Sequence, residues 1–518
     1  MSRCYVQPCS AYTVRRINRE IRMKKRRAYI SSNLIYGLIA LFSFVFMVAN
    51  SGNEGFWYDE FAQITFSGMG KSLMESLLTA DPTPPLFNVM ANVWYNIMPY
   101  GERWLLLLPQ LATALAVYIS GKWAESLYSA RVGAFTALLL GTSQIVIEQC
   151  GMEFRGYGNY LLFSALTFYF FSVRWRKKDR GYASESVFYG ISLALLLYTH
   201  LFGLLLFTAL LLADVIASWR QKKVWGRVLP YICAFASFMP WLIYFVTTQG
   251  EITAAEQVQW MPAPTIWETV KIGVFLCGNH VVTCLLCALG VVMMVTALSR
   301  MPKEQRYSER ELLRLIPLAI CVFMIGVAAI FGVMRAGKAT LFVKRYFTPL
   351  FLCCVLFAGV GLEQIIRWTN SLCSKTRKTA CGTVVSCVIL LSIISISLFK
   401  VASGDNPLGR YYQREAAEVL CAQPDIHNSN VAVVTTMDLY EEAWCEYYGR
   451  QQGRREGFCA KSIFDMTAEE LLSYNTIYFE YGFWPERSEE LDTRIALEKS
   501  YLIAEQWPEC DLVKYTRE

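Results

Sequence analysis

The sequence lacks the short motifs that identify most soluble enzyme sites and nucleic-acid-binding modules. It has no glycine-rich loop to hold a phosphate, no Ser/His/Asp pattern, and only three histidines in 518 residues. Cys284 and Cys287 form a CxxC pair, but no second pair or neighbouring histidine completes a zinc motif, so lipid-facing or packing roles are favoured. These absences exclude the common soluble classes and turn attention to the long apolar runs.

The features of a cleavable signal peptide are also absent. Residues 1–28 are rich in arginine and lysine, and the apolar run at 29–50 exceeds the roughly 7–15 apolar residues of a signal peptide. No Ala-x-Ala cleavage site stands at its end. The run is therefore predicted to be retained as the first transmembrane helix, with the basic segment 1–28 in the cytoplasm.

Hydrophobic residues make up 54% of the chain and its mean hydropathy is +0.32, which is typical of a multi-pass membrane protein. About eleven transmembrane helices are predicted between residues 29 and 400, at roughly 29–50, 104–121, 132–147, 158–173, 187–199, 202–217, 229–247, 280–298, 312–333, 346–366 and 382–400. Nearly all basic clusters between them fall on one side, which is the cytoplasmic side by the positive-inside rule. The expected location is the plasma (inner) membrane.

The chain changes character after the last apolar run. From Lys400 onward there are 12 Lys or Arg residues against 22 Asp or Glu residues. Strands are predicted at 431–436 and 476–481, and helices at 413–421 and 467–474. An odd number of spans places this small α/β domain, residues 401–518, on the extracytoplasmic side. Two disulfides in any of three pairings, or free thiols, are open for its cysteines Cys421, Cys445, Cys459 and Cys510.

The first outside loop, residues 51–103, holds one set of candidate site residues. They are Trp57, Asp59, Glu60, Asp81, Pro84 and Pro85. Acids flanked by aromatic rings at a membrane surface suit an interfacial reaction centre, because the rings sit at headgroup level while the acids stay hydrated. A solvated loop with an aromatic anchor is the alternative.

Later outside segments add a second set of candidates. They are Glu153, Arg155, Tyr157, His200, Lys344, Arg345 and Tyr346. Bases on the outside break the charge rule and indicate an anionic partner, for which a lipid-linked phosphate is the obvious choice. The alternatives are an interfacial ion pair of Glu153 with Arg155, headgroup anchoring by Lys344 and Arg345, and a satisfied turn residue at His200.

Three segments in this order carry a family resemblance: WYDE, then DPTPPLFNVMANVWYNIMPYGERW, then EFRGYGNYLL. Over residues 30–350 the chain resembles the glycosyltransferase C superfamily, especially enzymes like the protein mannosyltransferases and aminoarabinose transferases. Thr83 stands where histidine is common in the family. The resemblance implies the all-α polytopic glycosyltransferase C fold, with the catalytic acid in the Asp59–Glu60 pair.

The expected function is transfer of a sugar from a polyprenyl-phosphate donor to an acceptor on the outer face of the membrane. Asp59 is the predicted base, with Glu60 supporting it or helping to bind a divalent ion (Mg, Mn or Zn). Glu153 is predicted to face Asp59, and Arg155, Lys344, Arg345 and Tyr346 to bind the donor phosphate. Trp57, Asp81, Pro84, Pro85, Tyr157 and His200 are expected to line the pocket.

The expected partners are the lipid-linked donor, membrane lipids and a glycan, lipid or protein acceptor, with no nucleic acid. A transporter or lipid flippase is the alternative function, and it would require charges in the middle of spans and internal repeats. A scaffold or receptor with a degenerate site is a second alternative.

Overall fold

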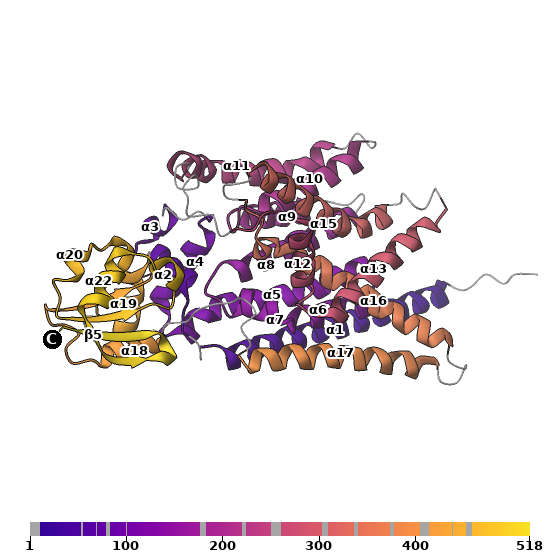
Figure 1. The fold of residues 1–518 in the computed structure, drawn as a ribbon. Helices are drawn as coiled ribbons and strands as arrows, with labels where there is room; N and C mark the ends of the chain where they lie inside the picture. Colours follow the sequence, from indigo (N-terminus) through magenta and orange to yellow (C-terminus); the bar gives the residue numbers. More distant parts are fainter. Residues whose placement is uncertain are drawn as a thin grey trace, which may run out of the picture.

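In the computed structural model, long helices form a bundle that carries a small mixed sheet at one end (Figure 1). The structure describes residues 11–52, 55–68, 70–78, 83–99, 101–176, 183–219, 224–249, 261–302, 309–335, 340–372, 378–404, 414–437, 439–451 and 458–517. Asp81, predicted to line the pocket, lies outside these residues, as do parts of the basic connecting segments.

All eleven predicted spans coincide with helical structure. The corresponding elements are α1 (Ala11–Asn50), α5 (Glu102–Leu127), α6 (Ala130–Gly141) with α7 (Gln144–Val146) and η1 (Ile147–Gly151), α8 (Tyr157–Arg176), α9 (Ala183–Leu197), α10 (Gly203–Trp219), α11 (Val224–Gln249), α13 (Val281–Ser299), α15 (Glu309–Met334), α16 (Pro349–Leu372) and α17 (Lys378–Ala402). Among the described residues, seven helices are long and apolar enough to cross a membrane, and the bent pair formed by α6 with α7–η1 is an eighth. Helices α9 and α10 are apolar but shorter. The predicted polytopic all-α fold is confirmed.

The predicted span at 132–147 is broken in the structure. Helix α6 ends at Gly141, and the following helix runs on at an angle of 62° to it. Its second half is a π-helix, η1, and such turns are frequent at functional sites. The bend falls at the non-apolar run Gly141–Gln144, which interrupts the apolar pattern and was included in one predicted span.

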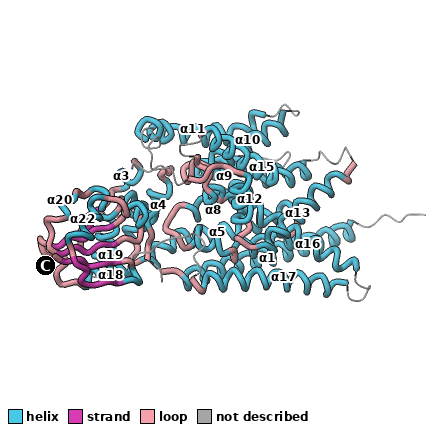
Figure 2. The backbone as a smooth tube through the Cα atoms, in the orientation of Figure 1, coloured by secondary structure: helices cyan, strands magenta, loops and turns pink. Residues whose placement is uncertain are grey.

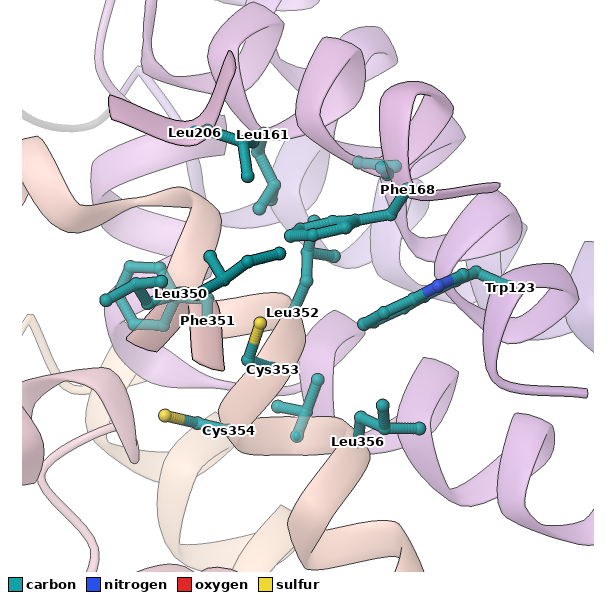
Figure 3. Close-up of a cluster of buried hydrophobic side chains, with 14 of the residues drawn as sticks. Trp123, Leu161, Phe168, Leu206, Leu350, Phe351, Leu352, Cys353, Cys354 and Leu356 are labelled. Carbon is teal, nitrogen blue, oxygen red and sulfur yellow. The ribbon is translucent and has the colours of Figure 1, made fainter. Parts of the chain in front are cut away.

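Close packing of helices defines the interior of the bundle. A Cβ atom at Gly290 of α13 would collide with the Phe357 carbonyl of α16, and one at Gly361 would collide with the Leu286 carbonyl. Small residues allow backbones to approach in this way within a membrane. Figure 3 shows part of the resulting core, where Trp123 and Phe168 stack with ring centroids 4.8 Å apart.

The first outside loop folds into three short helices, α2 (Tyr58–Ser67), α3 (Leu73–Leu77) and α4 (Leu86–Ile97). A further short helix, α12 (Ile266–Leu276), precedes α13. No helix was predicted in that segment.

The C-terminal residues form a five-stranded sheet with the strand order β2-β1-β3-β5-β4 (Figure 2). The strands are β1 (Val431–Thr435), β2 (Ala460–Ser462), β3 (Thr476–Glu480), β4 (Leu502–Trp507) and β5 (Leu512–Thr516). Strands β1, β2 and β3 are parallel, whereas β5 is antiparallel to both β3 and β4. The flanking helices are α18 (Arg414–Ala422), α19 (Glu441–Gln451), α20 (Ala468–Leu471), α21 (Pro485–Ser488) and α22 (Asp492–Ser500). Cys445, Cys459 and Cys510 are free cysteines, so the two-disulfide alternative does not apply.

The sheet end of the molecule packs directly on the first outside loop. The backbone N–H of Phe56 donates to the Tyr448 hydroxyl over 2.9 Å, and the Phe56 and Tyr447 ring centroids lie 5.2 Å apart. Arg414 Nε lies 3.5 Å from Glu102 Oε1. The C-terminal domain and Asp59 therefore lie at the same end of the bundle, as predicted (Figure 1).

Candidate functional site

Helix α2 places Asp59 in its first turn. Its N-cap is Trp57, and Glu60 closes a capping box by accepting from the Trp57 backbone N–H over 3.2 Å. The other Glu60 oxygen accepts from the Phe154 backbone N–H over 2.6 Å. Glu60 is 2% exposed, and this carboxylate ties the first outside loop to the segment that carries Glu153 and Arg155.

Two arginines that are distant in the sequence converge on Asp59. Arg155 Nη1 lies 3.2 Å from Asp59 Oδ2 and also donates to the Asp59 carbonyl over 2.9 Å. Arg345 Nη1 lies 2.8 Å from the same carboxylate oxygen. All three side chains are about one-fifth exposed. The ion pair of Arg155 that the structure defines is thus with Asp59, and the predicted residues do meet in space.

Glu153 is buried within the same group. It is 1% exposed and interacts electrostatically with Arg155, Tyr157 and Arg345. Two acids and two arginines therefore share one small region, as expected for a site that handles an anionic substrate.

Arg345 belongs to a short 3-10 helix, η4 (Lys344–Phe347), that directly precedes α16. Its carbonyl accepts from Thr348 Oγ1 over 2.7 Å and from Gln149 Nε2 over 3.4 Å. Gln149 lies in the π-helix η1 and also donates to Thr348 Oγ1 over 2.9 Å. Sequence reasoning missed this support, because nothing in the sequence marks Gln149 as a neighbour of a segment so far along the chain.

Aromatic rings line the region around Arg345. Its guanidinium lies 5.6 Å from the Trp57 ring centroid, and the Lys344 ammonium lies 5.2 Å from that of Phe275 in α12. Partial burial, followed by the charge of Arg345, lowers the pKa of Lys344. Both causes disfavour the charged form of Lys344, and a bound anion would offset them.

His200 joins the site from the turn between α9 and α10. Its ring stacks on Tyr160 at 4.7 Å, and lies 5.1 Å from Tyr346 and 6.0 Å from Tyr157. Its Nδ1 accepts from the Phe202 backbone N–H over 3.1 Å, as the alternative of a satisfied turn residue predicts. Burial, and then the charges of Arg155 and Arg345, lower the pKa of His200 to about 3. The imidazole is neutral at physiological pH.

Pro84 and Pro85 connect the first loop to this turn. Both are buried, and α4 begins immediately after them at Leu86. The Leu86 N–H donates to the Tyr198 carbonyl over 3.0 Å, two residues before His200. The two prolines therefore position the wall of the site that carries the histidine.

No family model matches the chain, and no curated protein matches it in sequence. Solved structures do match it. ArnT from Cupriavidus metallidurans in the apo state is 12% identical with a TM-score of 0.58, covering 92% of this chain and 97% of that one. The oligosaccharyltransferase of Archaeoglobus fulgidus in complex with Zn and sulfate is 12% identical with a TM-score of 0.53, covering 93% and 73%. The same enzyme tethered to an acceptor peptide with the NVT sequon is 11% identical with a TM-score of 0.51, covering 94% of this chain and 74% of that one.

The chain has the glycosyltransferase C fold. The two matching proteins are both members of the glycosyltransferase C superfamily, and the match extends over the helical bundle and the C-terminal region. At this level of identity the comparison shows the fold alone.

Within this fold, a group of half-exposed aromatic rings lies between α2 and the C-terminal sheet. The Tyr58 ring centroid lies 5.2 Å from Tyr440, 6.0 Å from Phe483 and 6.2 Å from Trp484. Tyr58 directly precedes Asp59, and Phe483 and Trp484 follow the carboxyl end of β3. Sequence reasoning missed these residues, because their proximity depends on how the sheet packs against the loop.

The described residues around Asp59 do not form a cation site. Asp59 faces two guanidinium groups, and both Glu60 oxygens accept from backbone N–H groups. Hard cations such as Mg²⁺ need several oxygen ligands directed at one point. In the part of the chain that the structure describes, the one cluster of three or more potential metal ligands consists of thiols instead.

Proposed function

We propose that the protein is a membrane glycosyltransferase that transfers a sugar from a polyprenyl-phosphate donor to an acceptor at the end of the bundle that carries the C-terminal domain. The observation that carries the proposal is the convergence of Arg155 and Arg345 on Asp59. That end of the bundle is proposed to be extracytoplasmic, because the described helix ends remote from Asp59 carry basic residues, such as Arg174 and Arg176 in the last turn of α8 and Arg367 near the end of α16.

The two arginines and Lys344 are proposed to bind the donor phosphate. A guanidinium carries five N–H donors in a planar fork, so it can contact a carboxylate and a phosphate at the same time. Lys344 adds a third positive charge from the adjacent position of η4. Together they would stabilise the negative charge that develops on the departing polyprenyl phosphate.

Asp59 is proposed to act as the base toward the acceptor. The bond between the anomeric carbon and the phosphate oxygen breaks, a bond to the acceptor oxygen forms, and the acceptor proton passes to Asp59. Polyprenyl phosphate leaves as an anion, so the step needs no general acid. Inversion at the anomeric carbon is expected, because the attack comes from the face opposite the leaving phosphate.

The aromatic group of Tyr58, Tyr440, Phe483 and Trp484 is proposed to contact the acceptor. It adjoins Asp59 on the side of the C-terminal domain, whereas the arginines adjoin Asp59 from the helix bundle. The acceptor and the departing phosphate would then lie on different sides of Asp59.

Metal dependence is a separate question. The matching oligosaccharyltransferase was solved with Zn and sulfate. The Asp59–Glu60 pair, by contrast, does not have the geometry of a metal site, and no step here passes through a metal. Turnover is therefore expected not to depend on added Mg²⁺ or Mn²⁺.

The deciding experiment compares full-length protein with Asp59→Asn and Glu363→Gln in detergent. Glu363 is a matched control, because it too pairs with two arginines, Arg131 at 3.2 Å and Arg367 at 3.4 Å, but on the distal part of α16. Release of polyprenyl phosphate from a labelled polyprenyl-phosphate sugar should fall only in Asp59→Asn. Movement of the donor between the two leaflets of a proteoliposome membrane, without any sugar transfer, would instead support the flippase alternative.

A further inference from the structure

Three cysteine side chains from three helices meet inside the bundle, apart from the Asp59 site. Cys277 is the C-cap of α12, Cys287 lies in α13 and Cys354 lies in α16. Their sulfur atoms all lie within 4.8 Å of one another. The sequence showed Cys287 only as half of an isolated CxxC pair, because Cys277 and Cys354 come from other segments.

The cluster has the surroundings of a built site. Cys277 is 7% exposed and Cys354 is 9% exposed, and Cys287 is partly buried. The Cys354 side chain points away from Trp123 (Figure 3). Cys287 interacts with both other thiols, and Cys284 interacts with Cys277.

The spacing of the sulfur atoms matches a thiolate-bound metal. A Zn–S bond of about 2.3 Å in a tetrahedral centre puts neighbouring sulfur atoms roughly 4 Å apart. Shifts of less than about 1 Å therefore bring the three thiols to bonding distance. The close packing of α13 on α16 at Gly290 and Gly361 holds two of the three helices at the required separation.

We propose that Cys277, Cys287 and Cys354 bind a thiophilic cation, either Zn²⁺ or Cu⁺. Soft thiolate ligands select these ions over Mg²⁺, Ca²⁺ and Mn²⁺. Three thiolates suffice for Cu⁺, whereas Zn²⁺ takes four ligands, and Cys284, which interacts with Cys277, is proposed as the fourth. The two ions therefore differ in whether they need Cys284.

The bound ion would stabilise the position of η4. Helix α12 packs against η4, where Lys344 contacts Phe275, and α16 continues directly from η4. An ion that links the end of α12 to α13 and α16 would restrain both neighbours of the segment that carries Arg345. This role is structural and does not require the ion to touch substrate.

The test measures metal binding by the purified full-length protein. Reduced protein in detergent is incubated with Zn²⁺, or with Cu⁺ under anaerobic conditions, desalted and assayed for bound metal by mass spectrometry. Wild type should retain one ion per chain. Cys287→Ser should lower the affinity by more than the roughly 10- to 100-fold that loss of an outer-shell partner costs. Cys233→Ser and Cys387→Ser, which replace exposed cysteines of α11 and α17, should bind like wild type.

A second measurement covers the case in which the variants do not fold. Metal should protect Cys287 of the wild-type protein from alkylation by a maleimide, and a chelator should remove that protection. Loss of Zn²⁺ binding in Cys284→Ser with retained Cu⁺ binding would assign four ligands to Zn²⁺ and three to Cu⁺. Wild type without bound metal, or a triple Cys277, Cys287 and Cys354 serine variant with unchanged binding, would overturn the proposal. A disulfide between two of the three cysteines in the protein as purified, before any reductant is added, would also overturn it.

Discussion

Two aspartates, each held by two arginines, lie far apart in the helix bundle and differ in almost everything else. Their partners are Arg155 and Arg345 for Asp59, and Arg174 and Arg227 for Asp214. The Asp214 carboxylate is 0% exposed, whereas that of Asp59 is 18% exposed. Asp214 lies near the end of α10 that is remote from the His200 turn.

The number of hydrogen bonds separates the two clusters further. Both Asp214 oxygens are engaged, since Oδ1 accepts from Trp175 Nε1 over 2.7 Å and Oδ2 accepts from the Tyr231 hydroxyl over 2.8 Å. Arg174 also donates to the Arg227 carbonyl over 3.0 Å, which joins α8 to α11. We interpret the buried cluster, in which both carboxylate oxygens accept hydrogen bonds, as structural. The same charges at the partly exposed Asp59 are available to a ligand.

The largest effect is expected from Asp59→Asn. The amide is nearly isosteric, so folding should survive, but turnover should fall by the roughly 10²–10⁴-fold that a lost general base costs. Sugar transfer and thermal stability are measured on the same preparation, with Glu363→Gln as control. Activity within a few-fold of wild type would transfer the role to Glu153.

Asp214→Asn should produce the opposite result. Removal of one partner from a buried ion pair leaves the buried Arg174 guanidinium uncompensated, at a cost of about 3–5 kcal/mol. The yield of folded protein and its melting temperature should drop sharply, while any protein that folds should turn over donor at a near-normal rate. A stable but inactive Asp214→Asn protein would break the comparison, because both aspartates would then serve the reaction.

Arg345→Ala tests whether the arginines that contact Asp59 bind the donor phosphate. Loss of a charge-assisted contact costs about 1.5–3 kcal/mol, or roughly ten- to a hundredfold in donor affinity. Arg345→Lys should recover only part, because an ammonium lacks the bidentate fork. Donor titration with a non-hydrolysable polyprenyl phosphonate measures both. A lower melting temperature with unchanged donor affinity would place Arg345 with the structural arginines of the Asp214 cluster.

Trp484→Ala should weaken acceptor binding, by less than Arg345→Ala weakens donor binding. Loss of one half-exposed ring from the group beside Tyr58 should raise the acceptor KM several-fold, on the order of 1 kcal/mol, and leave donor affinity unchanged. Trp267→Ala, which removes an exposed ring of α12, is the control. An equal effect of both substitutions would remove the aromatic group from the proposed acceptor site.

The sequence predicted the fold well where local pattern decides it. Apolar length and basic connectors identified the eleven helices, and β1 and β3 read as strands because their residues are apolar and β-branched. Strands β4 and β5 were not predicted, since most of β4 is exposed and β5 pairs with β3, which lies more than 30 residues earlier in the chain. The bend after Gly141 was also missed, because a window of mean hydropathy averages over the short polar run at residues 142–144.

The sequence was less informative about the site. It identified Asp59, Arg155 and Arg345 as candidates, but not that both guanidiniums contact one carboxylate oxygen. It grouped Glu60 with Asp59, although contacts with two backbone N–H groups give Glu60 a positioning role. Asp214 drew no attention, because a single acid in an apolar run has no local pattern, and Arg174 and Arg227 were interpreted only as topology markers.

His200 gives an effect on the pH dependence of stability, and this effect reports the burial of the imidazole together with the charges of Arg155 and Arg345. An unfolded histidine binds a proton near pH 6.5, whereas the pKa of about 3 keeps His200 neutral in the folded protein far below that pH. The unfolded state therefore binds more protons as the pH falls below 6.5, and stability is lost at up to about 1.4 kcal/mol per pH unit. His200→Gln should flatten the fall of the melting temperature between pH 7 and pH 5, because glutamine does not titrate. Arg155→Gln should flatten it in part, because removal of one nearby positive charge raises the histidine pKa toward its ordinary value. The slope of melting temperature against pH is compared in wild type, His200→Gln and Arg155→Gln. Equal slopes would mean that the imidazole is solvated and that the arginines at Asp59 do not act on it.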